Sequence, residues 1–171
     1  MILEEYIIPF GGLSEGVHEY VLNAEDKFFA HFNDQDILGG NIRIQLLILK
    51  KINFLELDFN LSGTLKLICD RCLDEFDMKI ETSQKLFVRF GEKYEELTEN
   101  VLIIPKGETR LNIAQYIFEF SALSVPIKKV HPMDKDGCYT CNPEMIKLLE
   151  KYKSESPDNN MVRNHLKNIL N

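Results

Sequence analysis

The chain has 171 residues, 44% of them hydrophobic, which predicts one domain of ordinary globular type with a substantial core. Its formal net charge of −7 opposes indiscriminate binding to a phosphate backbone, because such binding needs a positive field. No apolar run approaches the ~20 residues of a membrane span, and the first residues lack the basic start of a signal peptide. We therefore predict a cytoplasmic protein without a membrane partner.

Most of the first 90 residues alternate between apolar and polar side chains, a period of two that is typical of half-buried β-strands. The segments with this pattern, or with a similar strand-like composition, are 4–10, 16–22, 41–50, 54–61, 61–68, 76–81 and 85–90. Residues 24–32 stay ambiguous, because Phe28, Phe29 and Phe32 have helical spacing. Successive strands with short links predict an antiparallel meander curled towards a barrel.

Residues 92–100 are acidic and do not alternate cleanly, so they are predicted to form a surface loop. Such a charge run could serve as a landing site for a basic partner, but a solvated linker is the simpler interpretation. Residues 101–104 form a further short strand in this prediction.

Two helices are expected in the last third of the chain. The first runs over 111–123, with Asn112 as its cap and an apolar stripe made by Ile113, Tyr116, Ile117 and Phe120. The second follows Asn142, which can cap, and Pro143, which suits the first helical position.

These elements predict an α+β fold: an antiparallel meander or barrel-like sheet, one packed helix and a C-terminal helix. Residues 1–153 would form a single domain, and residues 154–171 a polar tail or frayed helix.

All four cysteines fall into two Cys-x-x-Cys motifs, Cys69 with Cys72 and Cys138 with Cys141. Each spacing lets a tight turn place two thiolates on one metal, so the pair of motifs predicts a structural zinc ion bound by four cysteines. Because strand patterns flank the first motif, it would occupy the tip of a hairpin. A redox motif of the thioredoxin kind needs a helix start, which only the second motif has. Reduced cysteines without metal, a redox pair and a disulfide remain alternatives.

His131 lies six residues before Gly137 and could replace one cysteine as a ligand. Since four cysteines already suffice for zinc, an ordinary loop or core histidine is the preferred interpretation. We find no P-loop, no nucleotide-binding glycine pattern and no zinc-protease or hydrolase motif, so no small-molecule substrate is expected.

The stretch from Leu67 to Leu73, which contains Cys69, Arg71 and Cys72, is followed by the acidic loop, a capped helix containing Glu119 and a Leu-Ser-Val-Pro stop. Together these features resemble the YceD-like family, named for bacterial large ribosomal RNA subunit accumulation, over about residues 40–141. Many members have Asp near the helix start, where Asn112 stands here. The resemblance implies a non-enzymatic cytoplasmic factor that supports accumulation of the large-subunit 23S rRNA.

Two classes of function follow. The first is a binding factor whose partner is a ribosomal protein, rRNA or a pre-ribosomal particle. The negative net charge of the chain favours a basic protein or an assembling particle as this partner. Arg71, Lys128 and Lys129 could form a local phosphate contact or be ordinary surface charge. The alternative is a metal-dependent or redox enzyme that uses the cysteine pairs. A zinc saturated by four thiolates argues against it, because catalytic zinc keeps an open position.

Overall fold

The structure is a computed structural model that describes residues 3–133, 135 and 140–154. It divides into two compact units, one within residues 1–68 and 75–129 and the other within residues 69–74 and 130–171. The first unit holds the sheet, and the second holds the described cysteines. No helix in the described part of the chain combines the length and the apolar character that crossing a membrane requires.

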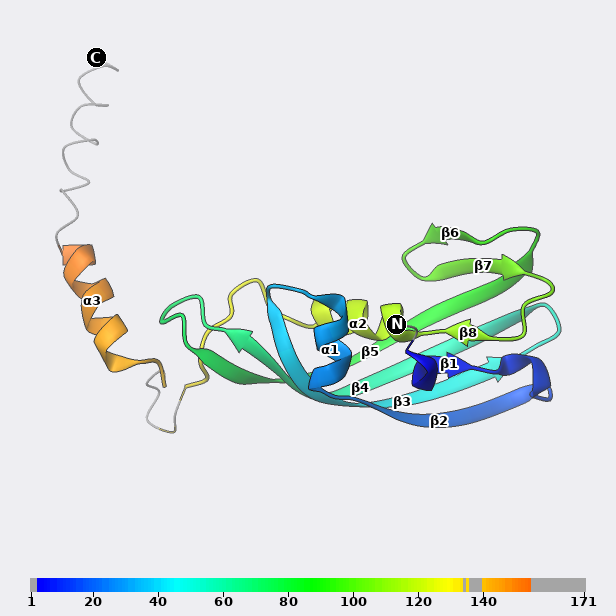
Figure 1. The fold of residues 1–171 in the computed structure, drawn as a ribbon, viewed down its shortest axis with the longest axis horizontal. Coiled ribbons are helices and arrows are strands. Elements are labelled where there is room, and N and C mark those ends of the chain that lie inside the picture. The colour runs from blue at the N-terminus through cyan, green and yellow to red at the C-terminus, as the bar shows by residue number, and fades with distance from the viewer. Residues whose placement is uncertain (1–2, 134, 136–139, 155–171) are drawn as a thin grey trace, which may run out of the picture. The chain divides into compact units, whose positions relative to one another are not determined.

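Six strands form the sheet of the first unit, in the order β2-β3-β4-β5-β7-β6 (Figure 1). Their bounds are β2 Gly16–Ala24, β3 Ile37–Lys50, β4 Phe54–Ile68, β5 Glu75–Gly91, β6 Glu95–Thr98 and β7 Val101–Pro105. Alternate residues of β3 and β4 are buried, as their period-two pattern predicts. The predicted hairpin is confirmed, because β4 pairs antiparallel with β5 from Phe54 opposite Arg89 to Ile68 opposite Glu75.

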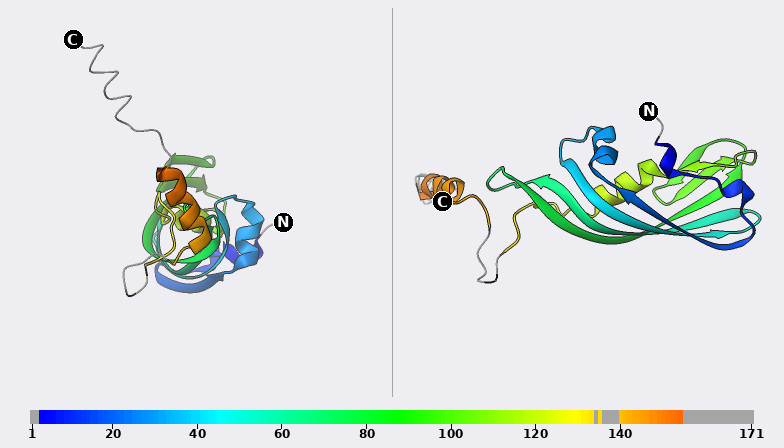
Figure 2. Two further views of the ribbon diagram at one scale, coloured as in Figure 1. Left: turned by 90° about the vertical axis from the view of Figure 1, so that its left-hand side faces the viewer. Right: turned by 60° about the horizontal axis from the view of Figure 1, so that its bottom comes forward.

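The predicted closure towards a barrel is wrong. Within the described residues the sheet is open, with β2 and β6 as its edges. Neighbouring strands are antiparallel except β5 and β7, which run parallel, so the chain leaves the simple meander after β5. The strands bend together, and α2 lies in their concavity, where the interior of a barrel would be (Figure 2).

The acidic segment 92–100 is not a loop throughout, which corrects the sequence-based prediction. Glu95 to Thr98 form the edge strand β6, which pairs antiparallel with β7. The side chains of this strand are largely exposed. Since neither face of the strand is buried, its sequence shows no alternation of apolar and polar residues.

The N-terminal segment predicted as one strand is divided. Its parts are the 3-10 helices η1 (Glu4–Tyr6) and η2 (Phe10–Gly12) and the two-residue strand β1 (Ile7–Ile8), which pairs with β8 (Leu111–Asn112). This small sheet brings the chain start beside the beginning of α2, because the N–H of Ile113 donates to the carbonyl of Tyr6.

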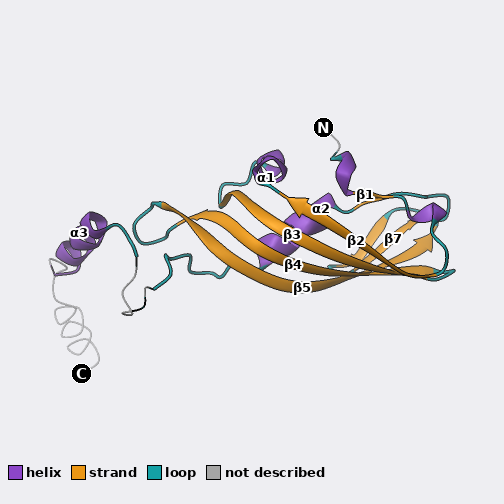
Figure 3. Cartoon of the chain, turned by 90° about the horizontal axis from the view of Figure 1, so that it is seen from below, coloured by secondary structure: helices purple, strands orange, loops and turns teal. Residues whose placement is uncertain are grey.

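Helices α1 (Asp26–Phe32) and α2 (Ala114–Leu123) lie on the same face of the sheet (Figures 1 and 3). Of the segment left ambiguous by the sequence, residues 24–32, the part from Asp26 onward is therefore helical. Phe120 of α2 meets Phe59 of β4 edge to face at 5.2 Å, and Phe118 stacks on Phe32 of α1 at 4.2 Å. The predicted apolar stripe of α2 is confirmed, since all four of its residues are at most 5% exposed: Ile113, Tyr116, Ile117 and Phe120.

The start of α2 depends on Asn112. Its Oδ1 accepts a hydrogen bond of 2.9 Å from the N–H of Ala114, although Asn112 lies one residue before the N-cap, Ile113. Asn112→Ala is expected to lower the free energy of unfolding by about 1 kcal/mol, because that N–H loses its acceptor. Urea denaturation measures this. Asn112→Asp retains the acceptor and serves as the matched control; equal losses in the two variants would contradict the capping role.

In the second unit, α3 (Pro143–Ser154) begins where the sequence predicts. Asn142 caps it, since its Oδ1 accepts from the N–H of Glu144 at 3.0 Å. The polar tail from residue 155, with its expected weak helix, lies outside the described residues.

Candidate metal centre

Residues 69–74 form the tight turn that joins β4 to β5. The N–H of Cys69 donates to the carbonyl of Asp74, and the N–H of Leu73 donates to the carbonyl of Cys69, each at 2.9 Å. Leu73 has a φ of 63°, the left-handed conformation that lets the chain reverse. The N–H of Arg71 points at the Sγ of Cys69, 3.4 Å away. The turn thus directs the N–H of Arg71 at the sulfur of Cys69 and brings Cys72 beside it.

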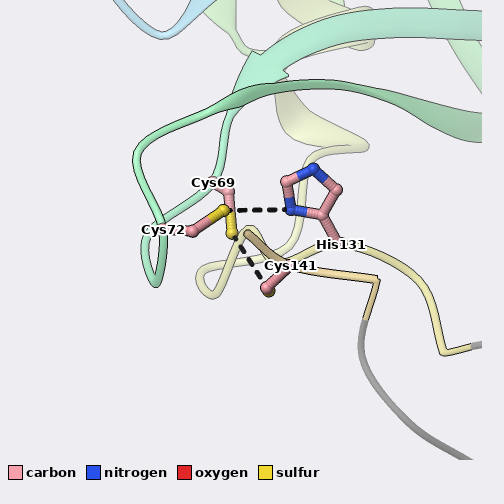
Figure 4. A group of neighbouring side chains, drawn as sticks. All are labelled: Cys69, Cys72, His131 and Cys141. Carbon is pink, nitrogen blue, oxygen red and sulfur yellow. Dashed lines mark hydrogen bonds between the residues drawn. The ribbon is translucent and has the colours of Figure 1, made fainter. Parts of the chain in front are cut away.

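Three thiols and one imidazole meet at this turn (Figure 4). The ligand atoms of Cys69, Cys72, His131 and Cys141 all lie within 4.8 Å of one another. The Sγ atoms of Cys69 and Cys141 are 3.9 Å apart, and the Sγ of Cys72 is 3.4 Å from Nδ1 of His131. Around tetrahedral zinc, with Zn–S of about 2.3 Å and Zn–N of about 2.0 Å, the corresponding edges measure roughly 3.8 and 3.5 Å. These two distances and the donor atoms therefore fit a zinc ion.

The three sulfurs are shielded from solvent: Cys69 is 0%, Cys72 2% and Cys141 8% exposed. Burial opposes the charged form of Cys69, but N–H groups of Cys72, Arg71 and His131 and the ring of His131 stabilise the thiolate, and together they lower its pKa to about 6. Burial, with the neighbouring sulfurs of Cys69 and Cys72, raises the pKa of Cys141 to about 11. At neutral pH the thiolate of Cys69 is thus already favoured, and thiolate is the form that binds metal.

A family model described as "Large ribosomal RNA subunit accumulation protein YceD" matches residues 57–170, which are 114 of the 171 residues. The chain belongs to the YceD family. No curated protein and no solved structure matches the chain. The matched range contains β5, α2, the cysteine cluster and all of β4 except its first three residues. The turn with Cys69 and Cys72, which is the most specific part of the resemblance, is also the part that contributes to the candidate site.

Of the four cysteines predicted as zinc ligands, the structure brings Cys69, Cys72 and Cys141 together. Cys138 lies outside the described residues, so its part in the four-cysteine set stays a prediction. All three described cysteines are free thiols.

The structure places His131 in the cluster, a position that the preferred interpretation as an ordinary loop or core histidine did not anticipate. Its ring lies in the cluster, with Nδ1 beside Cys72. This position was not foreseen because four cysteines already supplied a full ligand set, and no local pattern shows that the chain after Val130 returns to the hairpin turn. One feature of the sequence could have indicated His131 as a candidate ligand: it lies shortly before the second Cys-x-x-Cys motif, in a chain with few histidines.

The predicted phosphate contacts Arg71, Lys128 and Lys129 remain a prediction. Lys128 and Lys129 belong to the first unit and Arg71 to the second. Lys128 is exposed, whereas Lys129 forms an ion pair with Asp36 and its side chain is only 16% exposed. A phosphate at Lys129 would have to compete with that carboxylate.

Proposed function

We propose that this protein is a non-enzymatic cytoplasmic factor that supports accumulation of the large-subunit 23S rRNA by binding a component of the assembling subunit. The observation that carries the proposal is membership of the YceD family, whose description names large ribosomal RNA subunit accumulation. The family name supplies the cellular setting, and the chemistry of the chain supports the mode of action.

The donor set of the cluster supports binding over catalysis. Zinc would be held by Cys69, Cys72 and Cys141 with either His131 or Cys138 as the fourth ligand, and both sets are typical of structural zinc. Four protein ligands leave no position for water or substrate, which a catalytic zinc requires. The alternative, a metal-dependent or redox enzyme, predicts only three protein ligands or metal-free reactive thiols. Counting ligands by X-ray absorption separates the two.

The charge of the chain supports a basic partner. A net charge of −7 repels bare RNA except at a local patch, whereas ribosomal proteins are strongly basic and would be steered towards an acidic surface. We therefore favour a ribosomal protein, alone or within a pre-ribosomal particle, over free rRNA.

Depletion of the protein from cells is expected to lower 23S rRNA relative to 16S rRNA, because large-subunit assembly would lose a binding factor. Quantifying both rRNAs, together with gradient sedimentation of the extract, measures this. The protein should co-sediment with large-subunit precursors, and re-expression of the unaltered chain should restore the 23S level. Normal 23S rRNA after depletion, with the protein absent from precursor fractions, would refute the proposed function.

A further inference from the structure

A groove runs between α2 and the β6 edge of the sheet, entirely within the first unit. Its volume is about 570 Å³. Leu86 of β5, Val101 of β7 and Phe120 of α2 contribute apolar surface to it, and Leu123 at the end of α2 stands at its margin with 71% of its surface exposed. An exposed leucine beside an apolar groove is surface that a partner can cover.

Every charged residue that lines this groove is acidic. The three carboxylates are Glu96 on β6, Glu99 in the turn that follows it, and Glu119 on α2, and all three are exposed. Glu96 accepts a hydrogen bond from the hydroxyl of Tyr116 at 3.3 Å, and Glu119 accepts one from Gln115 at 2.8 Å. Among the described residues, none of the three forms an ion pair with a lysine or arginine.

A second cavity of the same unit shows the contrast. It is lined by the lysines Lys50, Lys51 and Lys106 together with Glu15 and Glu108, so its charges are mixed. Lys50 already donates to the backbone carbonyls of residues 10, 11 and 13. The groove at α2 differs because its negative charge is uncompensated and surrounds an apolar floor.

We propose that this groove binds a lysine- or arginine-rich protein segment that inserts a large apolar side chain against Phe120 and Leu123. Cationic side chains of the segment would neutralise Glu96, Glu99 and Glu119 at the rim. RNA fits the groove poorly, because its phosphates would face three carboxylates at close range. This inference rests on the proposed function, for which it names the surface and the chemistry of the partner.

Fluorescence anisotropy tests the charge requirement with a labelled peptide that alternates lysine and leucine. The variant Glu96→Gln/Glu99→Gln/Glu119→Gln removes three charges but keeps the acceptors for Tyr116 and Gln115. Its Kd for the peptide is expected to rise about tenfold at low salt, and by less as salt screens the rim. The matched control Glu4→Gln/Glu19→Gln/Glu108→Gln removes three exposed carboxylates elsewhere in the unit and should change the Kd less than about twofold.

The apolar requirement is tested by Leu123→Ser, with Ile52→Ser as control, because Ile52 is similarly exposed, at 76%. Leu123→Ser should weaken binding of the leucine peptide roughly threefold or more, and should leave unchanged the binding of a peptide with serine in place of leucine. Circular dichroism melting checks that the variants remain folded.

Equal losses in the two glutamine variants would overturn the groove as the binding surface. So would an RNA oligonucleotide that binds more tightly than the peptide and gains affinity when the three rim carboxylates are removed. Either result would leave the depletion phenotype untouched, so failure of this inference is distinguishable from failure of the proposed function.

Discussion

Cys69→Ser is expected to abolish stoichiometric zinc binding and to unfold the residues that surround the cluster. Zinc binding by such a set contributes on the order of 10 kcal/mol. The second unit joins residues 69–74 to residues after 130 through these side chains, so the free energy of zinc binding becomes folding free energy of this unit. Elemental analysis after metal-replete purification should give about one zinc per unaltered chain and well under one for the variant. Hydrogen exchange should show α3 losing protection.

The fourth ligand is decided by a matched pair of variants. If His131 completes the set, His131→Gln should lose zinc as Cys69→Ser does and Cys138→Ser should retain it; a four-cysteine set reverses the two results. X-ray absorption of the unaltered protein should correspondingly give three sulfurs and one nitrogen, or four sulfurs. His31→Gln, at an exposed histidine of α1, controls for the substitution itself. Well under one zinc per unaltered chain after metal-replete purification would refute the shared site.

Gly63→Ala is expected to lower the free energy of unfolding by at least about 3 kcal/mol. A Cβ built on Gly63 would lie 2.1 Å from the carbonyl oxygen of Asn41 and 2.8 Å from Cα of Ile42. Both atoms belong to the backbone of β3, which pairs with β4 along its length, and Ile42 is fully buried. The backbone of β3 cannot rotate away as a flexible side chain would, so β3 and β4 must separate locally.

Guanidinium chloride denaturation measures the effect. Gly12→Ala is the control, because a Cβ at Gly12 meets nothing within 4 Å, and it should change stability by less than about 1 kcal/mol. Similar stabilities for the two variants would show that β3 and β4 can separate at Gly63 at little cost.

The features that the sequence alone determined are those with a local physical cause. Period-two alternation predicted β3, β4 and β5, because one face of each strand is buried and the other meets solvent. Asn142 and Pro143 predicted the start of α3, because the free N–H groups of a helix start need an acceptor. The two Cys-x-x-Cys spacings predicted that cysteines would gather at the hairpin turn, and the structure places Cys69 and Cys72 there beside Cys141; that they bind zinc stays a prediction.

The tertiary structure decided what depends on contacts between distant segments. Whether the sheet closes was settled by the parallel pairing of β5 with β7 and by α2 occupying the concave face, and neither leaves a periodic signal in the strands. Strand β6 was missed because its exposed acidic side chains bury no alternating face. His131 joins the thiols across 59 residues from Cys72, and the acidic groove draws Glu96 and Glu119 from a strand and a helix far apart in the chain. Local sequence patterns do not show such contacts, because the contacts form only when folding brings distant segments of the chain together.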